Sequence, residues 1–368
     1  MSSETMAEAP APTLAAESPV TPLKLGVRTP PWRPLPEVAA FAARVEELGY
    51  DTVAITDSPM LWRDTMCALA VVAMQTERIT IGTAVTNPVN RTPVQLASAF
   101  RTIAELAPGR TRLAMATGDS AVLLAGGRPA RVAEYRDAVH LIRDLLAGKA
   151  PFAHAPDTVL QDPPEQVVPI FVAGGGPRMV ATAGEIGDGL MSNNKNLDAK
   201  RRWLVEAAAA AGRPTPFHTI GVSVHITDDI ERDARRLKPF MAKYVQRDGG
   251  DFMAAQGFEV NVPGRDFKLP DGTDLAHPTD VEMAIEVSSQ WISDELALWC
   301  AQNLVVWGDA DEVRQRLLGL WRKGVNEVLA RTDGAFQFPT EMAERLAAEV
   351  MTPLREDMNA EISASTTA

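Results

Sequence analysis

Apolar residues follow two alternating patterns along this chain. Short, mostly apolar runs such as 52–56 are typical of buried strands, whereas residues 36–49 carry apolar side chains every three or four positions, as on one face of a helix. The predicted strands are 23–28, 52–56, 79–81, 110–117, 169–173, 189–192, 218–226 and 327–330. The predicted helices are 36–49, 62–75, 93–106, 129–146, 177–186, 198–211, 311–323 and 340–354.

These units repeat in series, each strand followed by a helix. Eight such units predict an α/β protein of the (β/α)8 TIM-barrel class. An open, doubly wound sheet is the main alternative. It is disfavoured because no G-x-G-x-x-G fingerprint follows the first predicted strand at 23–28.

Two segments interrupt the repeat. Residues 148–168 are rich in Pro and Gly without a clear period, which predicts a loop. Residues 244–303 mix Gly, Pro and Asp with a helical pattern around 281–298, which predicts a partly helical insertion. We expect both at the carboxyl-terminal face of the strands, where they would cover the barrel mouth and select the substrate.

The two ends of the chain differ from the barrel in composition. Residues 1–22 are rich in Ala, Pro, Glu, Ser and Thr and lack the basic start and apolar run of a signal peptide, so a disordered tail is predicted. Residues 358–368 are predicted to form a frayed C-terminal tail. A single barrel domain is therefore expected over 23–357.

The charge and cysteine content exclude several classes of protein. A net charge of −12 and no basic stripe disfavour binding to nucleic acid or to an anionic membrane. Cys67 and Cys300 form no C-x-x-C pair, so a disulfide framework is not expected and a reducing cytoplasm fits. No metal site and no membrane-spanning helix are predicted.

The carboxyl-terminal ends of barrel strands are where ligands bind and chemistry takes place. Gly174-Gly175-Gly176-Pro177 precedes a helix and offers backbone N–H groups to a phosphate, with an ordinary turn as the alternative. Asp119 and Asp57 are candidate proton-transfer or ligand-binding groups, although both also suit turns or helix caps. Trp62 is a candidate wall of the site or a core residue.

Three stretches together resemble the bacterial luciferase-like superfamily of flavin and deazaflavin oxidoreductases. They are GTAVTNPVNRTP at 82–93, GRTRLAMATGDS at 109–120 and PIFVAGGGPRMVATAGEIGDGL at 169–190. The resemblance is in particular to the branch containing methylenetetrahydromethanopterin reductase and deazaflavin-dependent glucose-6-phosphate dehydrogenase. It covers most of residues 23–332, but not the tails or the 244–303 insertion.

This resemblance implies roles for individual residues. The peptide between Ala84 and Val85 would be cis and would support the cofactor ring, and Asp57 would approach the polar edge of that ring. Asp119 would lie near the reacting centre. The implied cofactor-binding residues are Asp57, Ala84, Val85, Thr86, Asn87, Gly118, Asp119, Ala173, Gly174, Gly175, Gly176 and Pro177. The implied catalytic residues are Asp119, Ser58 and Trp62.

Ser58 departs from the pattern of the resembling enzymes. Members that oxidise an alcohol have a histidine directly after the aspartate of the second strand, whereas this chain has Ser58 after Asp57. A serine does not act as a base near neutral pH without help. Sugar dehydrogenation by that mechanism is therefore disfavoured, and a reduction or a monooxygenation is easier to accommodate.

Three functions remain open from the sequence. The first is hydride transfer between the reduced deazaflavin coenzyme F420 and a small organic substrate. The second is a monooxygenase that uses O2 and reduced FMN (FMNH2), with a partner reductase supplying the reduced cofactor. The third is a non-catalytic binding protein on a flavin fold. The resemblance also implies a homodimer formed through early helices such as 62–75.

Overall fold

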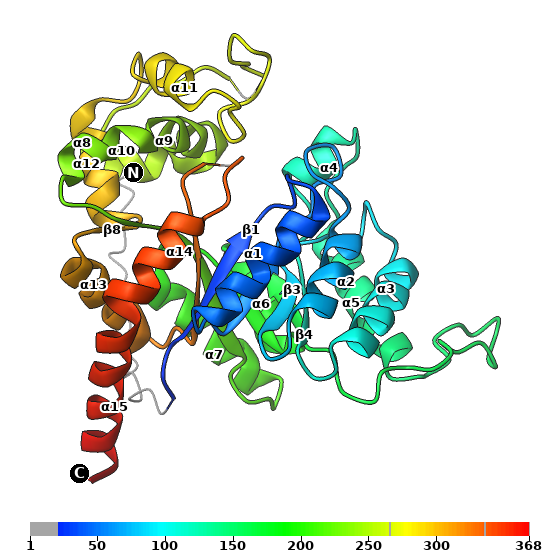
Figure 1. Cartoon of the computed structure of the whole chain (residues 1–368). Helices are drawn as coiled ribbons and strands as arrows, with labels where there is room; N and C mark the ends of the chain where they lie inside the picture. Colours follow the sequence, from blue (N-terminus) through cyan, green and yellow to red (C-terminus); the bar gives the residue numbers. More distant parts are fainter. Residues whose placement is uncertain (1–20, 265, 335, 368) are drawn as a thin grey trace, which may run out of the picture.

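The computed structural model describes residues 21–264, 266–334 and 336–367. Parallel strands pair in the order β6-β5-β4-β3-β2-β1-β9-β7-β8, and a further pairing of β6 with β7 closes a barrel of eight strands (Figure 1). The predicted TIM barrel is therefore confirmed. The strands are Lys24–Thr29 (β1), Thr52–Ile55 (β2), Thr80–Thr83 (β3), Thr111–Met115 (β4), Ile170–Ala173 (β5), Gly189–Ser192 (β6), Phe217–Ile226 (β7), Val306–Gly308 (β8) and Glu327–Arg331 (β9).

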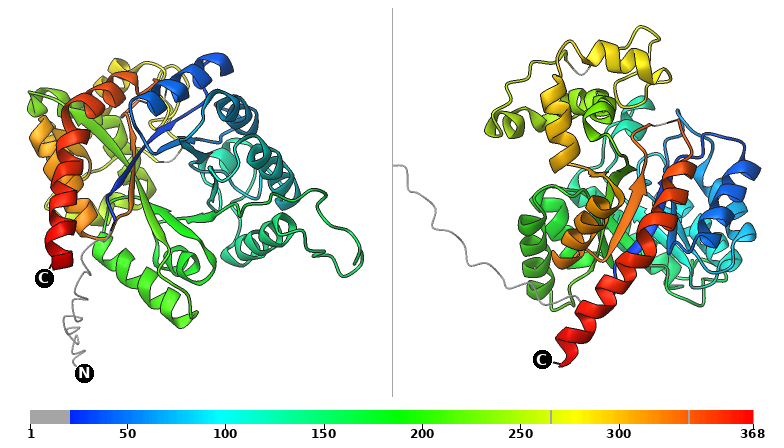
Figure 2. Two further views of the ribbon diagram at one scale, coloured as in Figure 1. Left: turned by 60° about the horizontal axis from the view of Figure 1, so that its bottom comes forward. Right: turned by 60° about the vertical axis from the view of Figure 1, so that its left-hand side comes forward.

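Helices surround this barrel, most of them at the predicted places (Figure 2). They are Leu35–Glu47 (α1), Thr65–Gln75 (α2), Pro93–Leu106 (α3), Ser120–Leu124 (α4), Val132–Leu146 (α5), Pro177–Ile186 (α6), Leu197–Ala210 (α7), Ala310–Arg322 (α13), Thr340–Leu346 (α14) and Thr352–Thr367 (α15). Local sequence explains the sharpest boundaries. Helix α3 begins at Pro93, behind a capping box in which the Thr92 hydroxyl accepts the Gln95 N–H.

Strand β8 is an element that the sequence pattern did not predict. Its three residues pair with Val224–Ile226, the carboxyl-terminal part of β7, and lie outside the ring of eight. The predicted strand at 327–330 corresponds to β9, which pairs with both β1 and β7 and completes the ring. The short helix α4 was not predicted either.

A buried ion pair occupies the interior of the barrel. Arg112 Nη1 donates to Glu327 Oε2 at 2.7 Å, and Glu327 also accepts the hydroxyls of Thr52 at 2.6 Å and Thr219 at 2.8 Å. The Arg112 guanidinium lies 4.6 Å from the ring centroid of Phe171. Four strands are thus joined inside the barrel by polar contacts, while the main hydrophobic core lies between strands and helices.

The segment between β7 and β8 forms a helical insertion beside the carboxyl ends of the strands (Figure 1). Its helices are Ile230–Ala234 (α8), Lys238–Tyr244 (α9), Gly250–Ala255 (α10), Val281–Ser288 (α11) and Asp294–Asn303 (α12). They enclose a hydrophobic cluster of their own, which already includes Ala234 and Leu237. The insertion therefore begins before residue 244, and Asp229 caps its first helix.

Two expectations about loops and ends are wrong. The 148–168 loop leads from α5 into the start of β5, so it lies at the amino-terminal ends of the strands, away from the mouth (Figure 2). Arg101 of α3 donates to Gln161 O of this loop at 2.8 Å. Residues 358–367 of the predicted tail at 358–368 are instead part of α15, and Met358 is fully buried against the barrel. The predicted tail at 1–22 lies almost wholly outside the described residues.

Candidate functional site

The turn after β3 carries the chain from the sheet to α3 at the barrel mouth. Ala84 and Val85 are joined by a cis peptide bond, which confirms the geometry implied by the resemblance. Beyond it, the Thr86 N–H donates to Ala114 O at 3.0 Å and the Ala116 N–H donates to Thr86 O at 2.9 Å. Backbone hydrogen bonds therefore hold Thr86 against the end of β4.

Asp57, just beyond β2, is buried beside this turn. Its carboxylate accepts the Thr86 hydroxyl at 2.6 Å and the Arg91 guanidinium through Nε at 2.8 Å and Nη2 at 3.2 Å. The side chain of Asp57 is only 1% exposed, whereas Asp64, which pairs with the same guanidinium, is 46% exposed. The carboxylate of Asp57 thus links Thr86 to Arg91 and positions both.

Asn87 and Gly118 each shape a turn beyond a strand end. Asn87 Oδ1 accepts the N–H groups of Val89 at 3.1 Å and Asn90 at 2.8 Å, which closes the turn after β3. Gly118 has a φ of +99°, and a Cβ there would lie 2.4 Å from a Val122 methyl carbon. Glycine is therefore required in the turn from β4 into α4.

Buried polar atoms without a hydrogen-bonding partner gather after β1 and β2. They include Arg28 Nε, Thr56 Oγ1 and Ser58 Oγ. Buried polar atoms are normally paired, so an unpaired group at a barrel mouth fits a site that completes its hydrogen bonds with a ligand. Since no described group accepts the Ser58 hydroxyl, no base is placed to activate it.

Asp119 projects from the end of β4 toward the insertion. Its side chain is 57% exposed and forms an ion pair with Arg247, which lies on the π-helix Val245–Gly249 (η2). Asp119 occupies the N-cap position of α4, yet its carboxylate makes no capping hydrogen bond. The capping alternative is therefore wrong, and Asp119 is a rim residue that contacts the insertion.

Trp62 lies before α2, not inside it as predicted. Its ring centroid is 5.0 Å from that of Phe336, in the segment after β9, and 6.0 Å from that of His277, in the insertion. Three segments far apart in sequence therefore meet at Trp62. This arrangement favours the wall of a site over packing within a helix core.

The glycine-rich turn leads from Ala173, the last residue of β5, to Pro177, the first residue of α6. The Gly174 N–H donates to Met191 O at 3.0 Å, whereas in the described part of the chain no group accepts the N–H of Gly175 or Gly176. Lys200 Nζ lies 3.7 Å from where a Cβ of Gly175 would stand. Free N–H groups beside a lysine suit an anion such as a phosphate.

Two lysines, one buried and one partly buried, lie on this side of the mouth. Burial lowers the pKa of Lys200 to about 8. Burial also lowers the pKa of Lys195 to about 7, and the positive charges of Lys200 and Arg331 act in the same direction. The ammonium group of Lys195 lies over the ring of Tyr244. An anionic ligand would relieve the mutual repulsion of these cations.

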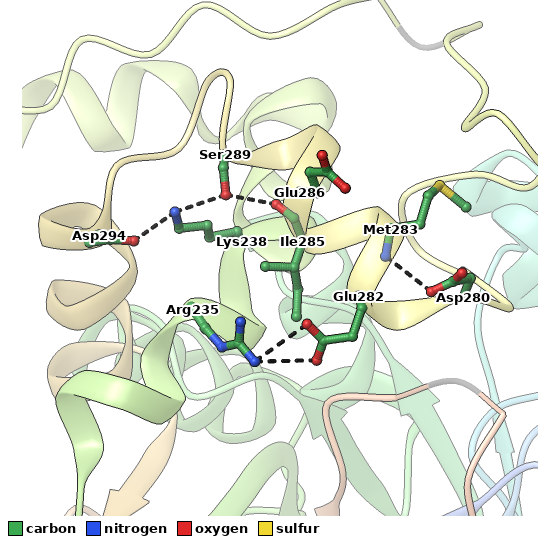
Figure 3. Close-up of a pocket in the computed structure, with 9 residues that line it drawn as sticks. All are labelled: Arg235, Lys238, Asp280, Glu282, Met283, Ile285, Glu286, Ser289 and Asp294. Atoms are coloured by element: carbon green, nitrogen blue, oxygen red, sulfur yellow. Dashed lines mark hydrogen bonds and ion pairs between the residues drawn. The ribbon is translucent and has the colours of Figure 1, made fainter.

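A cleft of about 570 Å³ lies in the insertion, between η1 (Arg235–Leu237), α9, α11 and α12 (Figure 3). Its two cations are compensated within the protein. Lys238 Nζ lies 2.7 Å from Asp294 Oδ1 and donates to Ser289 Oγ at 2.9 Å, while Arg235 pairs with Glu282 at 3.3 Å. The remaining charged groups of the lining, Asp280 and Glu286, are carboxylates, so the cleft is unsuited to an anionic cofactor.

Three tryptophans of the insertion region pack in a core. Trp307 is fully buried and donates to Ser223 Oγ at 3.1 Å, whereas Trp291 and Trp299 pack against phenylalanines of the insertion. These contacts are those of core residues.

Three residues of the mouth were not singled out as candidates from the sequence. They are Arg91, Lys200 and Arg331. Arg91 stands inside the TNPVNR stretch, so the motif itself was a signal. Lys200 is followed by two arginines on an amphipathic helix, where it cannot be told from a solvated lysine. Arg331 ends β9, and only the closed barrel brings it beside Arg28 of β1, a strand-end residue that the sequence does indicate.

The described residues also limit other kinds of site. Among them, no group of three or more His, Cys, Asp and Glu side chains is arranged to hold a metal ion. None of the described helices combines the length and the apolar character that crossing a bilayer requires.

Fold and site together define a TIM-barrel protein whose candidate ligand-binding elements are the turn after β3, the glycine-rich turn before α6 and the basic residues of the mouth. The chain belongs to the luciferase-like monooxygenase family, whose model matches residues 14–327.

Two relatives are about one-third identical to this chain over about half of its length. The F420-dependent glucose-6-phosphate dehydrogenase of Kribbella flavida is 36% identical over 221 residues, which cover 54% of this chain and 66% of that protein. The enzyme of the same name from Kineococcus radiotolerans is 35% identical over 216 residues, covering 52% of this chain and 64% of that protein. The match spans slightly less than two thirds of each relative's length.

Solved structures share the fold at lower identity. The coenzyme F420-dependent tetrahydromethanopterin reductase of Methanopyrus kandleri has a TM-score of 0.69 and 20% identity, covering 90% of this chain and 99% of that one. The FMN complex of the oxygenating constituent of 3,6-diketocamphane monooxygenase from Pseudomonas putida has a TM-score of 0.59 and 18% identity, covering 90% and 98%. These likenesses support the barrel and its insertion.

Proposed function

We propose that this protein is an oxidoreductase that transfers hydride between the coenzyme F420 and a small organic substrate. The observation that carries the proposal is the 36% identity to an enzyme named for that coenzyme. The alternative is a monooxygenase that uses FMNH2, O2 and a partner flavin reductase. The name of the family supports it. Ser58 supports it too, because the position after Asp57 needs a base to oxidise an alcohol and serine does not supply one.

The residues at the barrel mouth fit such a coenzyme. The N–H groups of Gly175 and Gly176, with Lys200 beside them, would hold a phosphate, and the turn from Ala84 to Asn87 would support the ring. Asp57 would act through Thr86 and Arg91, because its carboxylate already binds both. When bound, the coenzyme supplies the hydride chemistry, and the chain supplies position, charge and a proton donor.

Coenzyme titration tests this proposal. Purified protein is titrated with F420 and, separately, with FMN, and binding is followed by the change in cofactor fluorescence. We expect saturable F420 binding, and at least a tenfold weaker affinity in Gly175→Asp, because the new carboxylate repels the phosphate. Gly176→Ala is the matched control, since no atom lies within 4 Å of the added methyl group and the N–H is kept.

The outcomes separate the candidate functions. Tight FMN binding without F420 binding would contradict the F420 proposal and favour the monooxygenase. Binding of either cofactor without turnover of its reduced form would favour a non-catalytic binding protein. Equal F420 affinity in Gly175→Asp and wild type would place the phosphate elsewhere.

Asp119 is the proton donor or acceptor that the site offers at its rim. We expect Asp119→Ala to lower kcat about 10²- to 10⁴-fold, the usual contribution of a positioned acid or base. The unfolding midpoint in urea should change little, because the carboxylate is exposed and its surface ion pair stabilises weakly. Arg247→Ala is the control, since it removes the same ion pair and keeps the carboxylate. Equal losses of kcat in the two variants would show that the ion pair matters and not the acid.

We propose that the chain forms a homodimer in the cytoplasm. The exposed apolar side chains Met74 on α2 and Val94 on α3, 76% and 45% exposed, support an interface on the early helices. The free thiols Cys67 and Cys300 support a reducing compartment. Sedimentation of the intact chain as a monomer, or its recovery outside the cytoplasm on cell fractionation, would contradict these proposals.

A further inference from the structure

Arg28 and Arg331 stand side by side inside the barrel mouth. Strands β1 and β9 pair in register, with Val27 opposite Ala330, so the next residues along each strand are these two arginines. Val27 and Ala330 face the helices, as members of the outer core, whereas Leu329 belongs to the inner cluster. Because side chains alternate along a strand, both guanidinium groups point toward the barrel axis.

Among the described residues, no carboxylate forms an ion pair with either arginine. Arg28 Nε is buried without an acceptor, and the described partner of Arg331 Nη1 is the adjacent Thr332 O, at 3.1 Å. Burial lowers the pKa of Arg331, and the charge of Asp333 opposes this shift only in part. Asp333 is itself held by Arg236 through two hydrogen bonds of 3.0 and 2.8 Å. Burial, reinforced by the neighbouring Arg331 charge, lowers the pKa of Arg28 to about 10.

Other arginines beside the strands have partners of two kinds. Arg112 has Glu327 and Arg91 has Asp57, at 2.7 and 2.8 Å, whereas Arg110 donates to the carbonyl oxygens of Ala73, Thr76 and Ile79. A buried charge is costly unless it is paired, and two adjacent like charges add repulsion. Arg28 Nε has neither kind of partner, and Arg331 Nη1 has only a carbonyl oxygen among the described residues.

The groups around the pair can donate hydrogen bonds. The hydroxyls of Thr56 and Ser58, beyond the end of neighbouring β2, are buried and also lack partners. Arg331 lies 5.8 Å from the ring centroid of Phe240, which the ammonium of Lys195 approaches at 5.9 Å. Guanidinium groups and hydroxyls together match the oxygens of a carboxylate or a phosphate.

We propose that Arg28 and Arg331 form an oxyanion-binding subsite, and that the substrate of the proposed oxidoreductase carries a carboxylate or phosphate group. The part of this inference that concerns the substrate rests on the proposed function. The subsite itself is a property of the chain and is tested without the coenzyme. It is distinct from the glycine-rich turn, which follows β5 and not β1 or β9.

Inorganic phosphate is the first probe. The full chain without coenzyme is titrated calorimetrically with phosphate at low ionic strength, as wild type, Arg28→Gln, Arg331→Gln and Gly175→Asp. We expect saturable binding that is about ten- to a hundredfold weaker in each arginine variant, the range for hydrogen bonds to charged groups. Gly175→Asp removes any binding at the glycine-rich turn and keeps the subsite. Arg44→Gln, an exposed arginine on α1, controls for net charge.

A thermal melt separates binding from a structural role. Removing an uncompensated buried charge should leave Tm unchanged or raise it, so a Tm lowered by both arginine substitutions would overturn the proposal. Unchanged phosphate affinity in both arginine variants, or no saturable binding by Gly175→Asp, would overturn it as well.

The coenzyme is the second probe, and it decides where the anion comes from. F420 affinity that is unchanged in the arginine variants supports a substrate anion. An F420 affinity that falls tenfold or more in these variants would mean that the two arginines bind the coenzyme, and would overturn the inference that the substrate is an anion. A wild type that binds phosphate at the arginines but binds no F420 would refute the proposed function and leave the subsite standing.

Discussion

Replacing Arg112 with methionine is expected to lower the free energy of unfolding by about 3–5 kcal/mol, the usual cost of leaving one member of a buried ion pair without its partner. The side chains of Arg112 and Glu327 are 6% and 1% exposed, so water does not compensate the remaining carboxylate. The hydroxyls of Thr52 and Thr219 stay on Glu327 and supply only part of the lost stabilisation. Urea unfolding followed by circular dichroism measures the change.

The double variant Arg112→Met/Glu327→Gln isolates the charge. It removes both charges and keeps an oxygen that accepts from the two threonines, so we expect it to recover more than half of the loss. Arg33→Met is the surface control, because its ion pair with Glu37 is about half exposed and contributes about 0–1 kcal/mol. If the single and double variants were equally unstable, lost packing on Phe171 would be the cause instead of the unpaired charge.

Asp57→Asn is the second large effect that we expect. The carboxylate accepts three hydrogen bonds, two of them from Arg91, and an amide oxygen cannot replace this charge-assisted arrangement. The free energy of unfolding should fall by about 2–3 kcal/mol, measured in urea. If Thr86 contacts the coenzyme as proposed, the F420 affinity should also fall about tenfold, since Thr86 loses its strongest side-chain acceptor.

Asp64→Asn provides the matched control. Its carboxylate pairs with the same Arg91 at 2.7 Å but is half exposed, and asparagine keeps its second role as the N-cap of α2. We expect a loss of about 0–1 kcal/mol and an unchanged F420 affinity. Similar losses for Asp57→Asn and Asp64→Asn would mean that Arg91 needs either carboxylate, and that Asp57 has no special role.

Elements with strong local signals were predicted well. The predicted bounds of α3 and α6 coincide with those observed, because each helix starts with a proline after a strand end. The cis peptide at Ala84 was expected only through the family resemblance, since nothing in the local pattern demands it. The predicted position of the 148–168 segment at the barrel mouth was wrong, although the prediction that it forms a loop was correct.

The failures share a physical cause. Strand β8 has only three residues and forms because the insertion brings it back to the outer part of β7. Residues 358–367 are helical because Met358 packs against the barrel, a contact that local composition does not reveal. In both places the local preference of the sequence is weak, and tertiary contacts determined the secondary structure.

The sequence by itself determined the repeat of strands and helices, the class of the fold and which strand ends carry the candidate residues, because these follow from periodicity and from local turn chemistry. The tertiary structure decided which side chains meet. Asp119 meets Arg247 across 128 positions, and Arg112 meets Glu327 across 215. Arg28 and Arg331 become neighbours only when β9 closes onto β1. Such pairings depend on the register of distant strands, and no window of the sequence contains them.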